Sequence, residues 1–101
     1  MRMIVLFDLP VETDADRREY RRFRRLLIKN GFFMMQESVY VKMVLNATVQ
    51  ESVMNIVEKG KPASGLVQCL VVTEKQFSGI VNIVGESKNN VIDTDERLVI
   101  L

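Results

Sequence analysis

The sequence contains no histidine, a single cysteine and no long apolar run, and each absence removes a class of function. Without histidine, a Ser/His/Asp or Cys/His catalytic group and a histidine-ligated zinc site are excluded. The lone Cys69 lacks a partner for an internal disulfide, and its apolar surroundings (LVQCLVVT) favour packing as a small hydrophobic side chain. No segment approaches the roughly 20 apolar residues of a membrane span, and no signal peptide precedes Asp8, which predicts a cytoplasmic protein without membrane contact.

An excess of charge of one sign is lacking too, because 14 basic residues nearly balance 13 acidic ones and the net charge is +1. Binding to nucleic acid must therefore depend on where the charges lie and not on their number. With 101 residues, 48% of them hydrophobic, the chain is expected to form one globular domain over residues 1–101. A domain of this size buries only about two thirds of its unfolded surface, so its size is compatible with an obligate oligomer.

Hydrophobic periodicity, capping patterns and glycine positions divide the chain into alternating strands and helices. Residues 3–7 are apolar on both faces, which is typical of a central strand that is covered on two sides. The predicted elements are a strand over 3–7, a helix over 14–30 that opens at a Thr13-x-x-Asp16 capping box and stops at Gly31, two strands within 32–45 divided at Gln36-Glu37-Ser38, a helix from a Thr48-x-x-Glu51 capping box to Gly60, a strand over 66–73, a polar turn over 74–77, a strand over 80–84, a loop over 85–96 and a short strand over 98–101.

This order of elements predicts an α+β protein with a ferredoxin-like βαββαβ fold and additional carboxyl-terminal strands. Two helices would cover one face of an antiparallel sheet and leave its other face open. Because the strand over residues 3–7 is apolar on both faces, the open face should be buried as well. A second copy of the chain, related by a two-fold axis, is the expected cover.

The first predicted helix carries half of the basic residues of the chain on the side away from its apolar face. Arginine predominates, and its planar guanidinium can bind two phosphate oxygens at once. This pattern favours binding to a nucleic-acid backbone without base specificity. The alternative is a solvated helix face whose charges are paired locally with acidic neighbours. The basic residues are Arg17, Arg18, Arg21, Arg22, Arg24, Arg25 and Lys29.

Asp8 follows the first predicted strand and precedes Leu9-Pro10. One interpretation is a turn residue whose carboxylate caps nearby backbone amides. The other is a catalytic acid or a metal ligand, and the absence of histidine then favours a hard ion such as Mg²⁺. A single carboxylate is a poor Mg²⁺ site unless phosphate oxygens and waters complete it. Two copies of Asp8 that meet near a dimer axis would supply a second acid.

Four segments of the chain, in order, resemble the CRISPR-associated protein 2 family in the form found beside type II systems. They are MIVLFDLPVET, EYRRFRRLLIKNGFFMMQESVY, VVTEKQF and DERLVIL. The resemblance implies a ferredoxin-like fold and a symmetric homodimer in which the carboxyl-terminal strand, here residues 97–101, crosses to the partner's sheet. It also implies that the dimer lies between two dimers of the CRISPR-associated protein 1 integrase and holds duplex DNA during spacer acquisition.

Members of that family are also described as metal-dependent nucleases that act on single-stranded RNA or double-stranded DNA, with the strand-end aspartate as metal ligand. By position this residue is Asp8. Our expectation is therefore a DNA-binding scaffold of CRISPR adaptation, with a Mg²⁺-dependent endonuclease as the alternative and a small-molecule regulatory module as a third hypothesis. The residues assigned to nucleic-acid binding are Arg17, Arg18, Arg21, Arg22, Arg25 and Lys29, and Asp8 is assigned to metal binding and catalysis.

Overall fold

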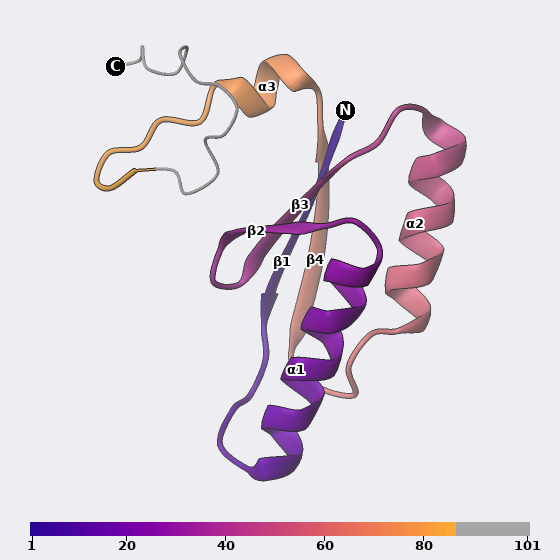
Figure 1. Cartoon of the computed structure of the whole chain (residues 1–101), viewed down its shortest axis with the longest axis vertical. Coiled ribbons are helices and arrows are strands. Elements are labelled where there is room, and N and C mark those ends of the chain that lie inside the picture. The colour runs from indigo at the N-terminus through magenta and orange to yellow at the C-terminus, as the bar shows by residue number, and fades with distance from the viewer. Residues whose placement is uncertain (87–101) are drawn as a thin grey trace.

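The structure, a computed structural model, describes residues 1–86 and contains four strands and three helices within them. Figure 1 shows the sheet with α1 and α2 beside it and the short α3 beyond one end of the sheet. The elements are β1 (Arg2–Asp8), α1 (Asp14–Lys29), β2 (Phe33–Gln36), β3 (Val39–Met43), α2 (Ala47–Lys59), β4 (Leu66–Val72) and α3 (Glu74–Ser78).

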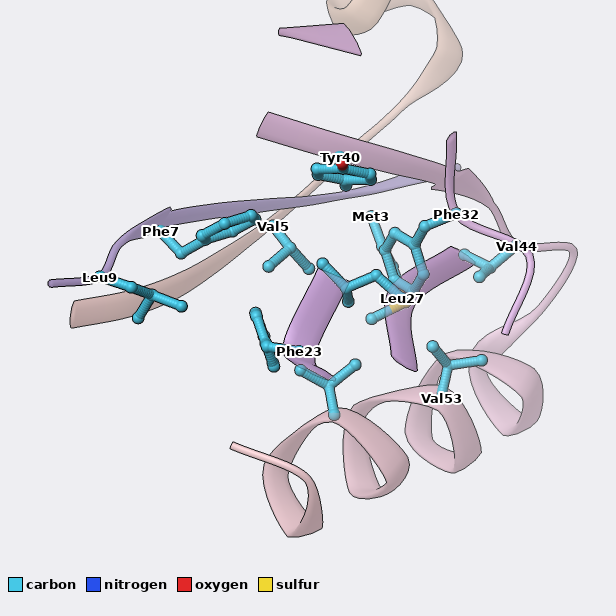
Figure 2. Close-up of a cluster of buried hydrophobic side chains, with 11 residues drawn as sticks. Met3, Val5, Phe7, Leu9, Phe23, Leu27, Phe32, Tyr40, Val44 and Val53 are labelled. Atoms are coloured by element: carbon cyan, nitrogen blue, oxygen red, sulfur yellow. The ribbon is translucent and has the colours of Figure 1, made fainter. Parts of the chain in front are cut away.

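The sheet is antiparallel throughout, with the strand order β2-β3-β1-β4. β1 lies between β3 and β4, as the apolar character of residues 3–7 predicted for a central strand. This order and the βαββαβ succession confirm the predicted α+β, ferredoxin-like fold. Both long helices cover the same face, because their buried side chains join one core with those of β1 (Figure 2).

The core is built from alternate residues of β1 and from the apolar sides of the two long helices. Met3, Val5 and Phe7 of β1 are buried on the helix-covered face. The Phe7 ring meets the Phe23 ring of α1 edge to face, with centroids 5.3 Å apart and planes at 88°. It also stacks on Tyr40 of β3, at 5.7 Å. Phe7 therefore packs the end of β1 against α1 and β3, directly before Asp8.

Cys69 packs on the same core from β4, as its apolar surroundings predicted. Its side chain is partly buried, and this burial raises the pKa of its thiol. A raised pKa lowers the fraction of reactive thiolate, which agrees with a packing role for Cys69.

Among the residues that the structure describes, no helix covers the other face of the sheet, and several large apolar side chains are exposed there. The register of the strands places one alternating set of residues on this face, opposite to the core residues of β1. Of this set, Ile4 and Val41 are buried, whereas its large exposed members have 37–54% of their surface accessible. We name the exposed members the open sheet face, which consists of Leu6, Phe33, Met43, Leu66 and Leu70. The predicted open face is therefore present in part, and the second copy that was expected to cover it stays a prediction.

The start of α2 differs from the sequence prediction. Asn46, not Thr48, is the residue that caps this helix, and its side-chain oxygen accepts a hydrogen bond of 2.9 Å from the Val49 amide. The capping box predicted for Thr48 and Glu51 is therefore wrong. Asparagine is at least as good a cap as threonine, so the earlier of two competing caps extends the helix by two residues.

The segment after β4 is helical where a polar turn was predicted. Residues 74–77 lie in α3, which a reciprocal capping box between Thr73 and Gln76 opens. The capping pattern Thr-x-x-Gln was the signal in the sequence for this short helix.

The strand predicted over Ile80–Val84 is irregular chain in the structure. Its β-branched residues favour a strand, but a strand needs a neighbour that accepts and donates its backbone hydrogen bonds. In the part of the chain that the structure describes, this segment pairs with no strand. The carboxyl-terminal strand predicted for residues 97–101 lies outside the described residues.

Arg2 of β1 fastens α3 to the sheet. Its Nε donates hydrogen bonds to both carboxylate oxygens of Glu74, at 2.9 and 3.2 Å, and its guanidinium lies 4.4 Å from the centre of the Phe77 ring. The hydrogen bond from Arg2 lowers the pKa of the Glu74 carboxyl below its ordinary value of 4.5. Folding therefore favours the ionised form of Glu74.

We expect the stability difference between the wild type and Glu74→Gln to depend on pH in a defined direction. Since the folded-state pKa is lowered, ionised Glu74 stabilises the fold above pH 4.5, and this stabilisation is lost as the pH falls through the lowered value. The effect should be small, because the Glu74 side chain is half exposed. Urea unfolding of both proteins from about pH 7 to about pH 3 measures it. A difference that stays unchanged at the acid end would contradict the role of the carboxylate.

Among the described residues, no helix is long and apolar enough to span a membrane.

Candidate nucleic-acid interface and metal site

Asp8 is the last residue of β1 and has an exposed side chain. It lines a cavity of about 460 Å³ between the end of β1, the first turns of α1 and the turn that joins β2 to β3. The cavity brings together both kinds of candidate residue, because a carboxylate from β1 and guanidiniums from α1 share its wall. It is lined by Asp8, Leu9, Val11, Arg17, Tyr20, Arg21, Glu37 and Ser38.

Neighbouring segments on both sides hold the end of β1 in place. The Phe7 amide donates a 3.0 Å hydrogen bond to the Ser38 carbonyl, in the turn between β2 and β3. On the other side, Gly65 precedes β4 with φ of +95°, a conformation that side-chain-bearing residues rarely adopt. A Cβ at Gly65 would lie 2.8 Å from the carbonyl oxygen of Asp8 and 2.8 Å from a methyl carbon of Leu9. Only glycine therefore fits beside Asp8 at this point.

We expect Gly65→Ala to destabilise the fold by about 1–3 kcal/mol, because the positive φ and the contact with the Asp8 backbone both oppose the methyl group. Urea unfolding measures this change. Gly85→Ala is the matched control, since Gly85 also has a positive φ, of +91°, but a Cβ there meets no atom within 4 Å. Equal effects of the two substitutions would show that the contact with Asp8 contributes nothing.

Four cations form one row along the exposed side of α1. At 100° per residue they fall within about 80° of the helix circumference, opposite to the core residues Phe23 and Leu27. All four are exposed, and within residues 1–86 none of their side chains makes a hydrogen bond or an ion pair. The α1 row, as we name it, consists of Arg18, Arg21, Arg25 and Lys29.

Arg17 binds within its own turn. Its guanidinium donates to the carbonyl oxygens of Val11 and Glu12, at 2.9 and 3.2 Å, and pairs with the Asp14 carboxylate. These bonds tie the segment after β1 to the first turn of α1. Although Arg17 lines the cavity, most of its donors are already used.

Arg22 is also tied to the fold. Its Nε lies 3.0 Å from a carboxylate oxygen of Glu19, and its Nη2 donates to the Gly60 carbonyl at the end of α2. The hydrogen bond from Arg22 lowers the pKa of the Glu19 carboxyl, and the same bond raises the pKa of Arg22. Arg24 in turn donates to the hydroxyl of buried Tyr40 at 2.8 Å. Local pairing, which the sequence left open as an alternative, therefore applies to some of the arginines and not to the α1 row.

The part of the chain that the structure describes offers few ligands for a metal ion. Within the described residues, no group of three or more cysteine, aspartate or glutamate side chains could hold one. At the cavity, Asp8 and Glu37 are the two carboxylates of the lining. Such a donor set fits Mg²⁺ bound mainly through phosphate oxygens and waters, because this ion keeps several waters and uses one or two carboxylates. It does not form a closed protein cage.

Comparisons with known proteins agree over most or all of the chain. A family model described as CRISPR associated protein Cas2 matches residues 1–80. A protein of Treponema denticola is 54% identical over 101 residues, which cover 100% of both chains. A protein of Ligilactobacillus salivarius is 43% identical with the same coverage, and one of Streptococcus mutans (strain UA159) is 40% identical over 100% of this chain and 93% of its own. Each of these three relatives is named CRISPR-associated endoribonuclease Cas2.

Proposed function

The chain belongs to the Cas2 family of CRISPR-associated proteins, and on this premise we propose that it is a DNA-binding scaffold of spacer acquisition. In this proposal a homodimer holds the backbone of duplex DNA and bridges dimers of the CRISPR-associated protein 1 integrase. The observation that carries the proposal is the α1 row, whose four exposed cations have no partner within residues 1–86. Such cations can exchange their counterions for phosphates without breaking contacts of the fold.

The dimensions of the α1 row suit a phosphate backbone. From Arg18 to Lys29 the helix rises by about 16 Å, and phosphates along one DNA strand succeed each other at about 3.4 Å of axial rise. The row therefore extends past several phosphates. The row contains no aromatic residue that could stack on a base, and its cations follow one side of the helix. It therefore supports positioning of DNA and not base reading. Arg17, just before the row, and Arg22, within its length, have donors used in the fold and would support this surface.

The open sheet face supports the dimer. Its five large apolar side chains, contributed by all four strands, are 37–54% exposed. A small chain with net charge +1 gains little solubility from charge, so this face favours association with a copy of itself. In the proposed dimer each protomer contributes one α1 row.

A second candidate function is a Mg²⁺-dependent endonuclease with Asp8 as metal ligand and catalytic residue. The cavity favours it, because Asp8 and Arg21 share its lining. The relatives' name, CRISPR-associated endoribonuclease, points in the same direction. Mg²⁺ would supply an activated water and charge stabilisation, whereas Asp8 would hold the ion and Arg21 would bind phosphate.

The experiment that tests the scaffold is a titration of fluorescent duplex DNA with the full-length protein at several salt concentrations. We expect affinity to fall linearly with salt on a double-logarithmic scale, with a slope of about 0.9 per phosphate bound. Affinity that is independent of salt would contradict the proposal, because it would exclude contacts between the α1 row and the phosphate backbone.

A further inference from the structure

Arg21 belongs to two surfaces at once. It is a member of the α1 row, and it is also the member of that row that lines the cavity beside Asp8. Arg18, Arg25 and Lys29 do not line the cavity. The two candidate functions of the protein therefore share one guanidinium.

The chemistry of the cavity selects an anion with an apolar part. Of the two arginines in the lining, Arg17 is bound to Val11, Glu12 and Asp14, whereas Arg21 has no such bond within the described residues. A planar guanidinium with all its donors available is suited to two oxygens of one phosphate. Leu9 and Val11 contribute an apolar part to the lining of the cavity. The combination fits the phosphate and the sugar or base of a nucleotide.

The size of the cavity suits a ligand of one nucleotide unit. Its volume of about 460 Å³ lies in the range of pockets that bind small molecules, about 300–1,000 Å³. The nucleotides of a duplex stay stacked and paired, so they reach a pocket of this kind only after extrusion from the helix. A free nucleotide or a single strand can enter directly.

The acids of the cavity set a condition for phosphate binding. Asp8 and Glu37 carry negative charge beside the position of the anion and repel it. A divalent cation at Asp8 offsets this repulsion, which is the condition under which a carboxylate and a phosphate share a site. Nucleotide binding should therefore be stronger with Mg²⁺ than without it.

We propose that Arg21 binds the phosphate of a single nucleotide in the cavity beside Asp8, and that a duplex held along the α1 row excludes this nucleotide by taking the same guanidinium. The inference deepens the proposed function, on which it rests for the duplex. Duplex binding along the α1 row and nucleotide binding in the cavity therefore exclude each other. A protein that holds duplex DNA cannot bind a single-stranded substrate in this cavity.

The test is calorimetric titration of the full-length protein with AMP in the presence of Mg²⁺, alone and with saturating duplex DNA. We expect Arg21→Gln to weaken AMP binding about ten- to hundredfold, since a hydrogen bond to a charged group is lost. The same variant should also weaken duplex binding, whereas Arg25→Gln should weaken duplex binding only. Saturating duplex should displace AMP from the wild type. Lys59→Gln on α2, a residue that belongs neither to the α1 row nor to the cavity lining, is the control for the loss of one charge.

Each outcome separates the inference from the function on which it rests. Unchanged AMP binding by Arg21→Gln, equal binding of adenosine and AMP, or AMP that saturating duplex does not displace would each overturn the inference while the scaffold stands. Duplex binding that neither Arg21→Gln nor Arg25→Gln weakens overturns the part assigned to the α1 row in the scaffold. That result also overturns the proposed competition for Arg21, and AMP binding then tests only its role in the cavity. Circular dichroism of the variants confirms that these exposed substitutions leave the fold intact.

Discussion

Duplex DNA binding is expected to weaken about 10²-fold at 0.15 M salt when Arg18, Arg25 and Lys29 are replaced together by glutamine. If each cation neutralises one phosphate, counterion release contributes about a fivefold affinity per contact at this salt concentration, and three contacts multiply. The slope of log affinity against log salt should become shallower by about 2.7 units per protomer that contacts the DNA. Fluorescence anisotropy over a range of salt measures both quantities.

These three positions are chosen because their side chains are exposed and make no bond within residues 1–86, so their loss should leave folding unchanged. Arg22 is left in place because it connects α1 to the end of α2 through the Gly60 carbonyl. The matched control replaces Lys59, Lys61 and Lys75, which removes the same charge without changing a residue of α1. If the control weakens binding as much as the α1 variant, the effect is one of net charge and the α1 row is not the interface.

The second large effect is expected for Asp8→Asn. This substitution keeps the shape of the side chain and removes the negative charge that would hold Mg²⁺. If the protein cleaves single-stranded RNA, we expect cleavage to fall about 10³-fold, since a catalytic ion contributes several kcal/mol to charge stabilisation. Duplex binding should remain within about twofold, because Asp8 is not part of the α1 row. Gel assays of labelled RNA with Mg²⁺ and with chelator measure the first quantity.

Glu12→Gln is the control for Asp8→Asn, because it removes a neighbouring carboxylate that does not line the cavity. Cleavage that survives Asp8→Asn at the wild-type rate would remove Asp8 from the reaction. A wild type that cleaves neither RNA nor DNA, together with intact duplex binding, would leave the scaffold as the function. The variant therefore discriminates between the two candidates directly.

Elements that depend on neighbouring residues were predictable from the sequence. The helix expected from Asp14 to Asn30 is α1, from Asp14 to Lys29, and its capping box is present. The Asp16 amide donates to the Thr13 hydroxyl at 3.0 Å, and the Thr13 amide donates to the Asp16 carboxylate at 3.3 Å. Capping involves partners only three residues apart, so the sequence displays the whole interaction.

The mistaken elements show where local information is insufficient. Asn46 and Thr48 both suit the start of a helix, and the choice of Asn46 depends on how the chain leaves β3. Residues 80–84 have the composition of a strand, but whether they form one depends on a neighbouring strand that their own sequence does not specify.

The sequence by itself determined the fold class, the amphipathic character of α1 and the position of Asp8 at a strand end, because each follows from local hydrophobic periodicity and capping. Only the tertiary structure decided which cations are available to a ligand. Arg22 is bound to a carbonyl 38 residues away, whereas Arg21 lies at a cavity that the turn containing Glu37 and Ser38 completes. Seven similar cations on one helix acquire different roles because long-range contacts use the donors of some and leave those of others free.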